Sequence, residues 1–376
     1  MRVSGKRPSV AFINNFRGPT MGGGEVQLLT LVAGLTAHHV DVTVVCVAGS
    51  ALESSLSKVA GVKVIPTDFA RWFLPPFAAG IASQVRGVSI VQGTGFLTNL
   101  VARRIGPRVR ASVINTAHVM PGSARQDGAS TASSIARFVL DRASRHRVDR
   151  FVAVSEAVAK AIAADAVDPR KIVVIPNGVN VARLQAAAAR MASVDIPEGV
   201  LVGFVGRLRR VKGCEVFLRA AALIAAQRPD IRFVIAGAGT GARSLRALAT
   251  ELGLDDRARF VGYVDPVAPV LGALDVVVVP SLSEAFGLSA IEALALRIPV
   301  VASRVGGLTE IIIDEQTGLL VPVGDERAIA GSVLRLLDDK DLANRLTTEG
   351  VQLVEERYTD RRMTEGYLKL YEDVAG

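Results

Sequence analysis

Short runs of β-branched residues recur along the chain and alternate with stretches whose apolar residues follow helical spacing. The first two runs are Ser9–Ile13 and Val40–Val47, and residues 25–37 between them have apolar side chains at helical intervals. Further runs lie at 62–65, 89–92, 110–115, 150–154 and 171–175, and then at 201–205, 232–236, 258–261, 276–279 and 299–302. Helices that connect strands in this way make the strands parallel, so the alternation predicts doubly wound parallel sheets.

The two series of strands predict two domains. A chain of 376 residues is too long for one ordinary core, and an Ala-rich stretch at 182–192 is interpreted as the linker region. We expect an N-terminal Rossmann-like domain over residues 1–182 and a C-terminal one over 183–358. A final helix, 359–376, is expected to pack back on the N-terminal domain. Open α/β sheets bind ligands at the carboxyl ends of their strands, so a central cleft between the domains is the expected binding region.

One stretch of the second series has the form of an anion-binding site. The strand Val276–Val279 is followed by turn residues, and apolar residues at helical spacing resume at Leu288. A helix N-terminus offers unpaired N–H groups and the positive end of the helix dipole, and Gly287 lets backbone approach a ligand. Glu284 and Glu292 flank this position. An acid beside a phosphate would repel it, so both are expected to face neutral groups such as sugar hydroxyls.

A basic turn follows the first strand of the same series. The segment Gly203–Gly213 places Arg207 and Lys212 between the end of a strand and the start of a helix. Cations at this edge can hold a diphosphate and stabilise it as it leaves. A basic surface turn is the alternative, but the clustering at this topological position favours a ligand. Cations for a diphosphate and carboxylates for hydroxyls together indicate a nucleotide sugar.

These residues belong to an ordered set of motifs that extends over nearly the whole chain. The motifs are Gly22–Glu25, His118, Val154–Glu156, Val174–Asn180, Gly206–Leu208 with Lys212–Gly213, Ser283–Leu288 with Glu292, Gly306–Glu310 and Thr317–Leu320. With them the chain resembles the retaining glycosyltransferases of GT-B fold, specifically glycosyltransferase family 4. The resemblance implies an α/β fold of two Rossmann-like, doubly wound domains facing a central cleft. It also implies transfer of a sugar from a UDP- or GDP-sugar to an acceptor such as a glycan or a lipid-linked molecule.

The resemblance implies catalytic roles for four residues. Arg207 and Lys212 would grip the donor diphosphate and neutralise the leaving nucleotide, and Glu284 would hold hydroxyls of the donor sugar. His118 follows a predicted strand and would contact the donor sugar near the reacting centre without acting as a general base. No carboxylate nucleophile is evident, and the family mechanism is usually described as a front-face displacement. Stabilisation of the leaving group would then carry most of the catalysis.

Further residues would bind the donor. Glu292 would hold the ribose hydroxyls, and Tyr263 lies where the family places the nucleobase, although a packed aromatic residue is the alternative interpretation. Backbone close to phosphate, sugar or acceptor would come from Gly23, Gly24, Phe286, Gly287 and Leu288. The resemblance implies neither a metal nor an organic cofactor.

Two other functions are compatible with this architecture. A nucleotide-sugar epimerase would need acid and base groups around the sugar, which we do not identify, and an inactive nucleotide-sugar-binding subunit is disfavoured by the intact candidate residues. Ala236–Gly241 superficially matches a dinucleotide fingerprint, but its third glycine is one residue early, so we interpret it as a tight loop near the nucleotide. Asp339–Asp341 has the D-x-D pattern of a metal site, yet it lies in a charged helical connection, and no metal is predicted.

Charge divides unevenly along the chain. Residues 1–195 contain 23 Lys and Arg against 11 Asp and Glu, net +12, whereas residues 196–376 contain 21 against 25, net −4. A polyanionic partner is expected for the first half only, and without a nucleic-acid-binding motif we favour an anionic membrane surface over nucleic acid. The membrane-binding face of this first half would combine Arg71–Phe77 with Arg103, Arg104, Arg108, Arg110, Arg137, Arg142, Arg145, Arg147 and Arg150.

The chain is expected to be cytoplasmic, with peripheral binding to the inner face of the plasma membrane as one possibility. No apolar stretch reaches the roughly 18 residues of a membrane span, and no run near the N-terminus is long enough for a signal peptide. Cys46 and Cys214 lie in different halves, which does not indicate a disulfide framework. The alternative for Trp72 and Phe73 is that they belong to the core.

Overall fold

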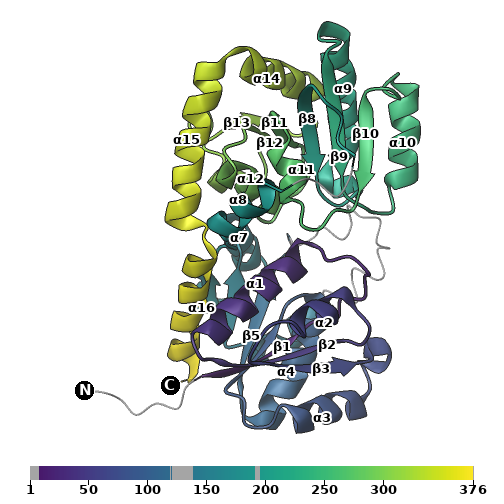
Figure 1. Cartoon of the computed structure of the whole chain (residues 1–376). Helices are drawn as coiled ribbons and strands as arrows, with labels where there is room; N and C mark the ends of the chain where they lie inside the picture. The colour runs from purple at the N-terminus through teal and green to yellow at the C-terminus, as the bar shows by residue number, and fades with distance from the viewer. Residues whose placement is uncertain (1–7, 119, 121–138, 191–194, 376) are drawn as a thin grey trace. The chain divides into compact units, whose positions relative to one another are not determined.

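A computed structural model of the chain describes residues 8–118, 120, 139–190 and 195–375. These residues form two compact units, and each unit has its own parallel sheet (Figure 1). The first unit contains the described residues up to Gly178 together with the segment that begins at Asp360, and the second contains Val179–Thr359.

The first unit is built on a seven-stranded sheet in the order β3-β2-β1-β4-β5-β6-β7. Its strands are β1 (Ser9–Ile13), β2 (Asp41–Val47), β3 (Val62–Thr67), β4 (Ile90–Gly93), β5 (Ser112–Ala117), β6 (Arg150–Ala153) and β7 (Ile172–Val174). Its helices include α1 (Gly23–Ala37), α2 (Ala51–Leu56), α3 (Pro75–Gln84), α4 (Phe96–Val109), α7 (Glu156–Ala164) and α16 (Asp360–Ala375). The strand order reverses between β1 and β4, which pair in parallel with Phe12 opposite Gln92.

Helix α16 brings the C-terminal segment onto the first unit, where it packs against α1 (Figure 1). Tyr367 and Tyr371 of α16 are buried in the same core as Phe12 of β1. Gly34 of α1 permits this packing, because a Cβ there would overlap the side chain of Thr364. The C-terminal helix therefore forms part of the core that supports the carboxyl ends of β1 and its neighbours.

The second unit is built on a six-stranded sheet in the order β10-β9-β8-β11-β12-β13, also parallel throughout. Its strands are β8 (Val200–Val205), β9 (Ile231–Ala236), β10 (Ala258–Gly262), β11 (Val276–Val279), β12 (Val300–Ser303) and β13 (Leu319–Val321). Its helices are α8 (Val181–Ala188), α9 (Cys214–Gln227), α10 (Ala242–Glu251), α11 (Ala268–Gly272), α12 (Leu288–Ala295), α13 (Leu308–Ile311), α14 (Glu326–Asp338) and α15 (Lys340–Arg357). Here the strand order reverses between β8 and β11, and such a reversal is where open α/β sheets bind ligands.

The predicted fold class is confirmed, and the strands lie close to where the sequence places them. One difference concerns the start of β5, since the predicted run begins at 110. Arg110 instead ends α4 with a left-handed backbone (φ 56°), and the strand starts at Ser112. The short strand β13 was not predicted, because its three residues are too few to show a pattern.

The Ala-rich stretch that we interpreted as a linker begins instead with a helix of the second unit. Helix α8 is capped by Asn180, whose side chain accepts a hydrogen bond from Arg183 N at 2.9 Å. It packs against α11 and α12, and Gln185 Nε2 donates to the carbonyl of Ala295 at 3.2 Å. Alanine has the highest helix propensity and a small side chain, so this composition suits a closely packed helix.

Two features are absent from the described part of the chain. No helix there has the length and apolar character needed to cross a membrane. Within the same residues, no group of three or more His, Cys, Asp or Glu side chains is arranged to hold a metal ion.

Candidate functional site

Two turns of the second unit meet where its strand order reverses, one after β8 and one after β11. The first contains a short 3-10 turn, Arg210–Lys212, and ends at Gly213, whose φ of 69° is left-handed. A Cβ at Gly213 would overlap the carbonyl oxygen of Pro280 in the second turn. Leu282 N also donates to the carbonyl of Val211 at 2.8 Å. Glycine is required at 213 both by the backbone angle and by the close contact.

The contact between these turns joins two predicted site residues. Lys212 Nζ lies 2.6 Å from Glu284 Oε2, and Ser281 Oγ donates to the same oxygen at 2.9 Å. The side chain of Glu284 is 10% exposed and that of Lys212 is 26% exposed. A partly buried charge is costly unless it is paired, so each of these groups compensates the other. The pair places one cation and one carboxylate next to the start of α12.

The turn from Glu284 to Leu288 offers backbone rather than side chains to a ligand. Phe286 is 4% exposed, and its ring packs edge-on against Tyr358 at 5.6 Å between centroids. Gly287 has a φ of 119° and precedes α12, whose first turn has no side-chain cap. The free N–H groups of such a helix end can bind an anion. A hydrogen bond from the N–H of Gly307 to the carbonyl of Glu284, at 3.1 Å, also fixes this turn.

Glu292 lies on α12, one helical turn beyond the turn that contains Gly287. The side chain is partly buried, and burial raises its pKa to about 7. A carboxyl of this kind carries a proton part of the time at neutral pH and can both donate to and accept from a hydroxyl. This chemistry suits neutral partners.

Arg207 and Tyr263 lie on turns that follow β8 and β10. The side chain of Arg207 is exposed, and it belongs to the same turn as Lys212. Tyr263 directly follows β10 and is 37% exposed. In this sheet β9 lies between β10 and β8, so Tyr263 is two strands away from Arg207. The structure therefore pairs Lys212 with Glu284, keeps Arg207 on the same turn as Lys212, and places Tyr263 two strands away from that turn.

The glycine-rich segment after β9 is explained by packing. A Cβ at Gly237 would overlap the carbonyl oxygen of Gly206, and a Cβ at Gly239 would overlap that of Leu208. Leu208 N donates to the carbonyl of Ala238 at 2.9 Å. These glycines let the turn after β9 lie directly against the turn that carries Arg207, which agrees with a tight loop.

The candidate residues of the first unit lie on two other segments. Gly23 begins α1 and Gly24 follows it, while the carboxylate of Glu25 accepts a hydrogen bond from the N–H of Gly22 at 3.1 Å. A Cβ at Gly24 would meet no atom within 4 Å, so the backbone there is open to an approaching group. This exposure is compatible with the backbone contacts expected from the sequence.

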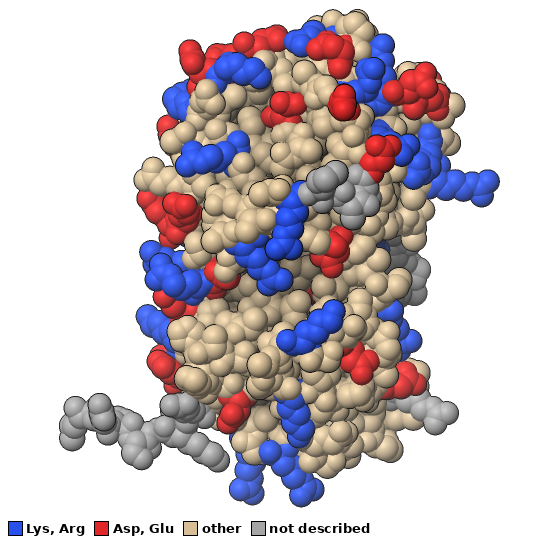
Figure 2. All heavy atoms as spheres, viewed as in Figure 1, with Lys and Arg blue, Asp and Glu red and all other residues tan. Residues whose placement is uncertain are grey.

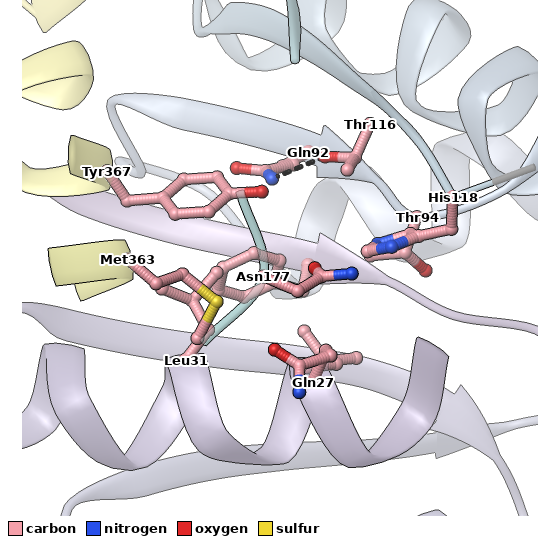
Figure 3. A pocket seen from close by; sticks show the side chains of 11 residues that line it. Gln27, Leu31, Gln92, Thr94, Thr116, His118, Asn177, Met363 and Tyr367 are labelled. Atoms are coloured by element: carbon pink, nitrogen blue, oxygen red, sulfur yellow. Dashed lines mark hydrogen bonds between the residues drawn. The ribbon is translucent and has the colours of Figure 1, made fainter. Parts of the chain in front are cut away.

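His118 directly follows β5 and lines a small pocket of the first unit (Figure 3). Burial lowers its pKa from 6.5 to about 4, so the imidazole is neutral at pH 7. In the first unit it lies close to Gln92, Thr116 and Asn177. A neutral imidazole has one donor and one acceptor nitrogen, which suits a hydroxyl and not a phosphate.

Sequence reasoning missed two residues at these sites. Ser281 orients Glu284 through the hydrogen bond described above, and Asn177 shares the pocket of His118. Both belong to segments that we singled out, yet neither carries a charge that would mark it. Asn177 lies in the Val174–Asn180 motif, which could have drawn attention to it, but only the folded chain brings it next to His118.

Two family patterns match the chain. Residues 21–183 match glycosyltransferase family 4, and residues 190–352 match the glycosyl transferases group 1. The D-inositol 3-phosphate glycosyltransferase of Corynebacterium efficiens is 32% identical over 301 residues, which cover 74% of this chain and 71% of that protein. The enzyme of the same name from Saccharomonospora viridis is 36% identical over 220 residues, which cover 54% of this chain. The chain spans about half the length of that second relative.

Solved structures of distant sequence share the fold. Sucrose-phosphate synthase from Thermosynechococcus elongatus superposes with a TM-score of 0.82 at 24% identity, covering 98% of this chain and 99% of that one. HepE of Anabaena in complex with UDP-glucose superposes with a TM-score of 0.81 at 18% identity, covering 97% of this chain and 99% of that one. The fold and the paired turns after β8 and β11 place the chain among the GT-B glycosyltransferases. More specifically, the chain belongs to glycosyltransferase family 4, a family of retaining, metal-independent enzymes.

Proposed function

We propose that this chain transfers a sugar from a nucleoside diphosphate sugar to a hydroxyl of an acceptor, with retention and without a metal. The observation that carries the proposal is the 2.6 Å contact between Lys212 and Glu284 at the strand-order reversal of the second unit. It places a phosphate-binding cation beside a carboxylate suited to sugar hydroxyls. Membership of family 4 supports the same reaction.

In this proposal the second unit holds the donor. When the donor binds, Lys212 exchanges Glu284 for the diphosphate, and Glu284 becomes available to the sugar hydroxyls. Arg207 and the N–H groups at Gly287 and Leu288 add positive potential where the bond to the diphosphate oxygen breaks and negative charge develops. Electrostatic stabilisation by charges that are already in place beside the leaving group is the largest single contribution to the rate enhancement in many enzymes.

The remaining donor contacts follow from position and chemistry. Glu292, with its raised pKa, would bind the ribose hydroxyls, and Tyr263 with its neighbouring backbone would border the nucleobase. On the first unit, Gly23 and Gly24 would offer backbone to a phosphate or to the acceptor, and His118 would bind a sugar hydroxyl. We assign acceptor binding to the first unit.

The names of the relatives suggest the first ligands to test. HepE of Anabaena is solved with UDP-glucose, and the curated relatives named here are D-inositol 3-phosphate glycosyltransferases. We propose a UDP-sugar as donor, with a polyol phosphate such as D-inositol 3-phosphate, a glycan or a lipid-linked molecule as acceptor.

The test is a donor and acceptor screen by mass spectrometry. UDP- and GDP-sugars are each combined with D-inositol 3-phosphate and, separately, with a lipid extract. Transfer is expected with one donor, and the product should keep the anomeric configuration of the donor. Nucleotide release with no sugar transferred would contradict the proposal, and formation of a C2 epimer would favour an epimerase.

Two variants test the site assignment. Lys212→Ala and Glu284→Ala should each lower turnover by about 10²–10³-fold, the usual effect of losing one preorganised stabilising group. Lys340→Ala and Glu349→Ala change the same residue types at exposed positions of α15 and should leave turnover unchanged. Near-normal turnover in both Lys212→Ala and Glu284→Ala would refute the assignment of these two residues to the donor site.

We also propose that the first unit binds an anionic membrane surface through the segment before α3. Phe73 and Leu74 are 58% and 38% exposed, and Arg104 donates to the carbonyl of Phe73 at 3.0 Å. Exposed apolar side chains beside arginine suit the headgroup region of a bilayer. Arg103 cannot contribute, because it is 1% exposed and paired with Asp141 at 2.9 Å.

The wider arginine set that we expected to form this face is only partly available. Arg145 pairs with Asp141 and Asp165, and Arg142 lies 3.7 Å from Asp165. Arg137 lies outside the described residues. On the face shown in Figure 2, basic and acidic residues are interspersed. The membrane proposal therefore depends on Phe73 and its surroundings and not on the net charge of the first half.

A further inference from the structure

The turn that offers its backbone to the donor, residues 284–288 and here called the donor turn, has little rigidity of its own. Gly287 has a φ of 119°, which glycine adopts readily and other residues adopt rarely, and glycine loses more conformational freedom on folding than any other residue. Helix α12, which follows, has no side-chain cap to fix its first N–H groups. Backbone in a rarely populated conformation persists only where its surroundings determine it. The N–H groups of Gly287 and Leu288 therefore depend on neighbouring residues for their direction.

Tyr358 contacts the donor turn through its aromatic ring. The ring packs against that of Phe286 with 5.6 Å between centroids and an interplanar angle of 75°. The two residues are only 5% and 4% exposed. Aromatic rings attract each other in this edge-on arrangement, so the contact orients the ring of Phe286 as well as burying it. Because Phe286 directly precedes Gly287, the backbone on one side of the glycine is fixed by this contact.

The hydroxyl of Tyr358 reaches the donor turn by a second route. It donates to the carbonyl of Glu310 at 3.1 Å, and burial raises the pKa of Tyr358 to about 12, so the hydroxyl remains a donor at neutral pH. Glu310 N donates to the carbonyl of Gly307, and Gly307 N donates to the carbonyl of Glu284, both at 3.1 Å. A Cβ at Gly307 would overlap the carbonyl oxygen of Ala285. The segment that Tyr358 holds therefore lies directly against the backbone of the donor turn.

The backbone of Tyr358 is itself fixed on both sides. Its N–H donates to the carbonyl of Val354 in the last turn of α15, and its carbonyl accepts from the N–H of Val179, both at 2.8 Å. Val179 also pairs with Thr359. All of these residues belong to the second unit. The side chain of Tyr358 thus extends from a held backbone and can impose its position on the donor turn.

From these contacts we propose that Tyr358 is a positioning residue for the donor site. It holds the donor turn so that the N–H groups of Gly287 and Leu288 keep the direction in which they bind the donor. Tyr358 acts through Phe286 and Glu310 and needs no contact with the donor itself. The inference rests on the proposed function for the identity of the ligand. Tyr358 lies outside the motifs that carry the family resemblance and beyond residues 190–352, which match the family pattern.

The experiment measures dissociation constants of UDP, UDP-glucose and GDP by calorimetry, which needs no acceptor. The wild-type chain is compared with Tyr358→Phe, Tyr358→Leu and Phe286→Leu. Phe233→Leu is the matched control, because Phe233 is fully buried on β9 of the same unit and its ring packs against Phe217 at 6.2 Å.

Tyr358→Phe keeps the ring and loses the hydroxyl, so the nucleotide that binds should bind about 3–10-fold more weakly, the usual effect of one hydrogen bond. Tyr358→Leu loses both contacts and should weaken binding by about 10-fold or more, because a misplacement of about 1 Å can cost up to about 10²-fold. Phe233→Leu should leave the dissociation constant unchanged. In a chain that is still mostly folded, lower stability alone does not change this constant, so the measurement separates positioning from folding.

A double variant tests the route through Phe286. Tyr358→Leu and Phe286→Leu remove the same contact, so their combination should weaken binding by less than the product of the two single effects. Effects that multiply fully would show that the two residues act independently and would overturn the proposal. An unchanged dissociation constant in Tyr358→Leu would also overturn it. If Tyr358→Leu does not fold, Tyr358→Phe takes its place in both comparisons.

The proposed function and this inference fail in different ways. Nucleotide binding that weakens as described, without any sugar transfer, would refute the proposed function while the positioning role of Tyr358 stands. Sugar transfer together with unchanged nucleotide affinity in the Tyr358 variants would refute the positioning role alone. A wild-type chain that binds none of the three nucleotides would refute both.

Discussion

Replacing Glu292 by glutamine would test the environment of the α12 carboxyl group. Glutamine has nearly the same shape and cannot ionise. Burial raises the pKa of Glu292 from 4.5 to about 7, so the folded chain keeps a proton that the unfolded chain has already lost. Between pH 4.5 and 7 the unfolded chain therefore binds fewer protons, and this group makes the free energy of unfolding fall as pH rises.

The size of the effect follows from the same pKa values. A change from 4.5 to about 7 corresponds to about 3 kcal/mol once the carboxyl is fully ionised, because one pKa unit is about 1.4 kcal/mol. Glu292 is partly exposed, so solvent screening reduces the expected difference to about 1–3 kcal/mol. Between pH 5 and pH 8, the free energy of unfolding of the glutamine variant should therefore increase by this amount relative to that of the wild-type chain.

The assay is urea unfolding of both chains at several pH values, with the free energy of unfolding extrapolated to water. All other titrating groups cancel in the difference between the two chains. Glu349→Gln, at an exposed position of α15, is the control and should show no such trend. A difference between wild type and Glu292→Gln that stays constant from pH 5 to pH 8 would refute the argument that burial shifts this carboxyl.

Three other predictions concern single positions. Gly213→Ala should destabilise the second unit by about 2 kcal/mol or more, because φ at this position is 69° and a Cβ would overlap a carbonyl oxygen. Gly331→Ala, at a position with open space around it, is the control and should leave thermal unfolding unchanged or raise the unfolding temperature. Equal changes in unfolding temperature for the two variants would contradict this prediction. Because burial lowers the pKa of His118 from 6.5 to about 4, the free energy of unfolding of the wild-type chain should rise by about 1–3 kcal/mol as pH rises between these two values. His118→Asn should lack this increase in urea unfolding. Curves of unfolding free energy against pH that are parallel for the two chains would exclude the argument. A smaller fraction of Phe73→Ser than of the wild-type chain should sediment with anionic liposomes. Binding of the wild-type chain to these liposomes should fall as the salt concentration rises. Binding that is absent or insensitive to salt would refute the membrane proposal.

Much of the fold is readable from the sequence because it depends on local patterns. Buried parallel strands need continuous β-branched runs such as Val276–Val279, and these runs alternate with helical spacing in an order that permits little besides doubly wound sheets. The positions of Arg207 and Lys212 after β8 follow from the same pattern, since a turn after a parallel strand must lie at the carboxyl edge. Local rules failed where a segment was short or lacked contrast, as for β13 and the Ala-rich helix α8.

The sequence by itself determined the two α/β units, the edge at which their turns lie and the residue types available for a nucleotide sugar. Only the tertiary structure decided which of these turns meet, because β8 and β11 are separated in the chain by two helix-strand units and become neighbours through the order of the sheet. That order brings Lys212 against Glu284, 72 residues away. Packing against Tyr358 buries the ring of Phe286, and the fold of the first unit places Asn177 and His118 in one pocket. Side-chain pairing at long range depends on packing, which no local pattern in the sequence encodes.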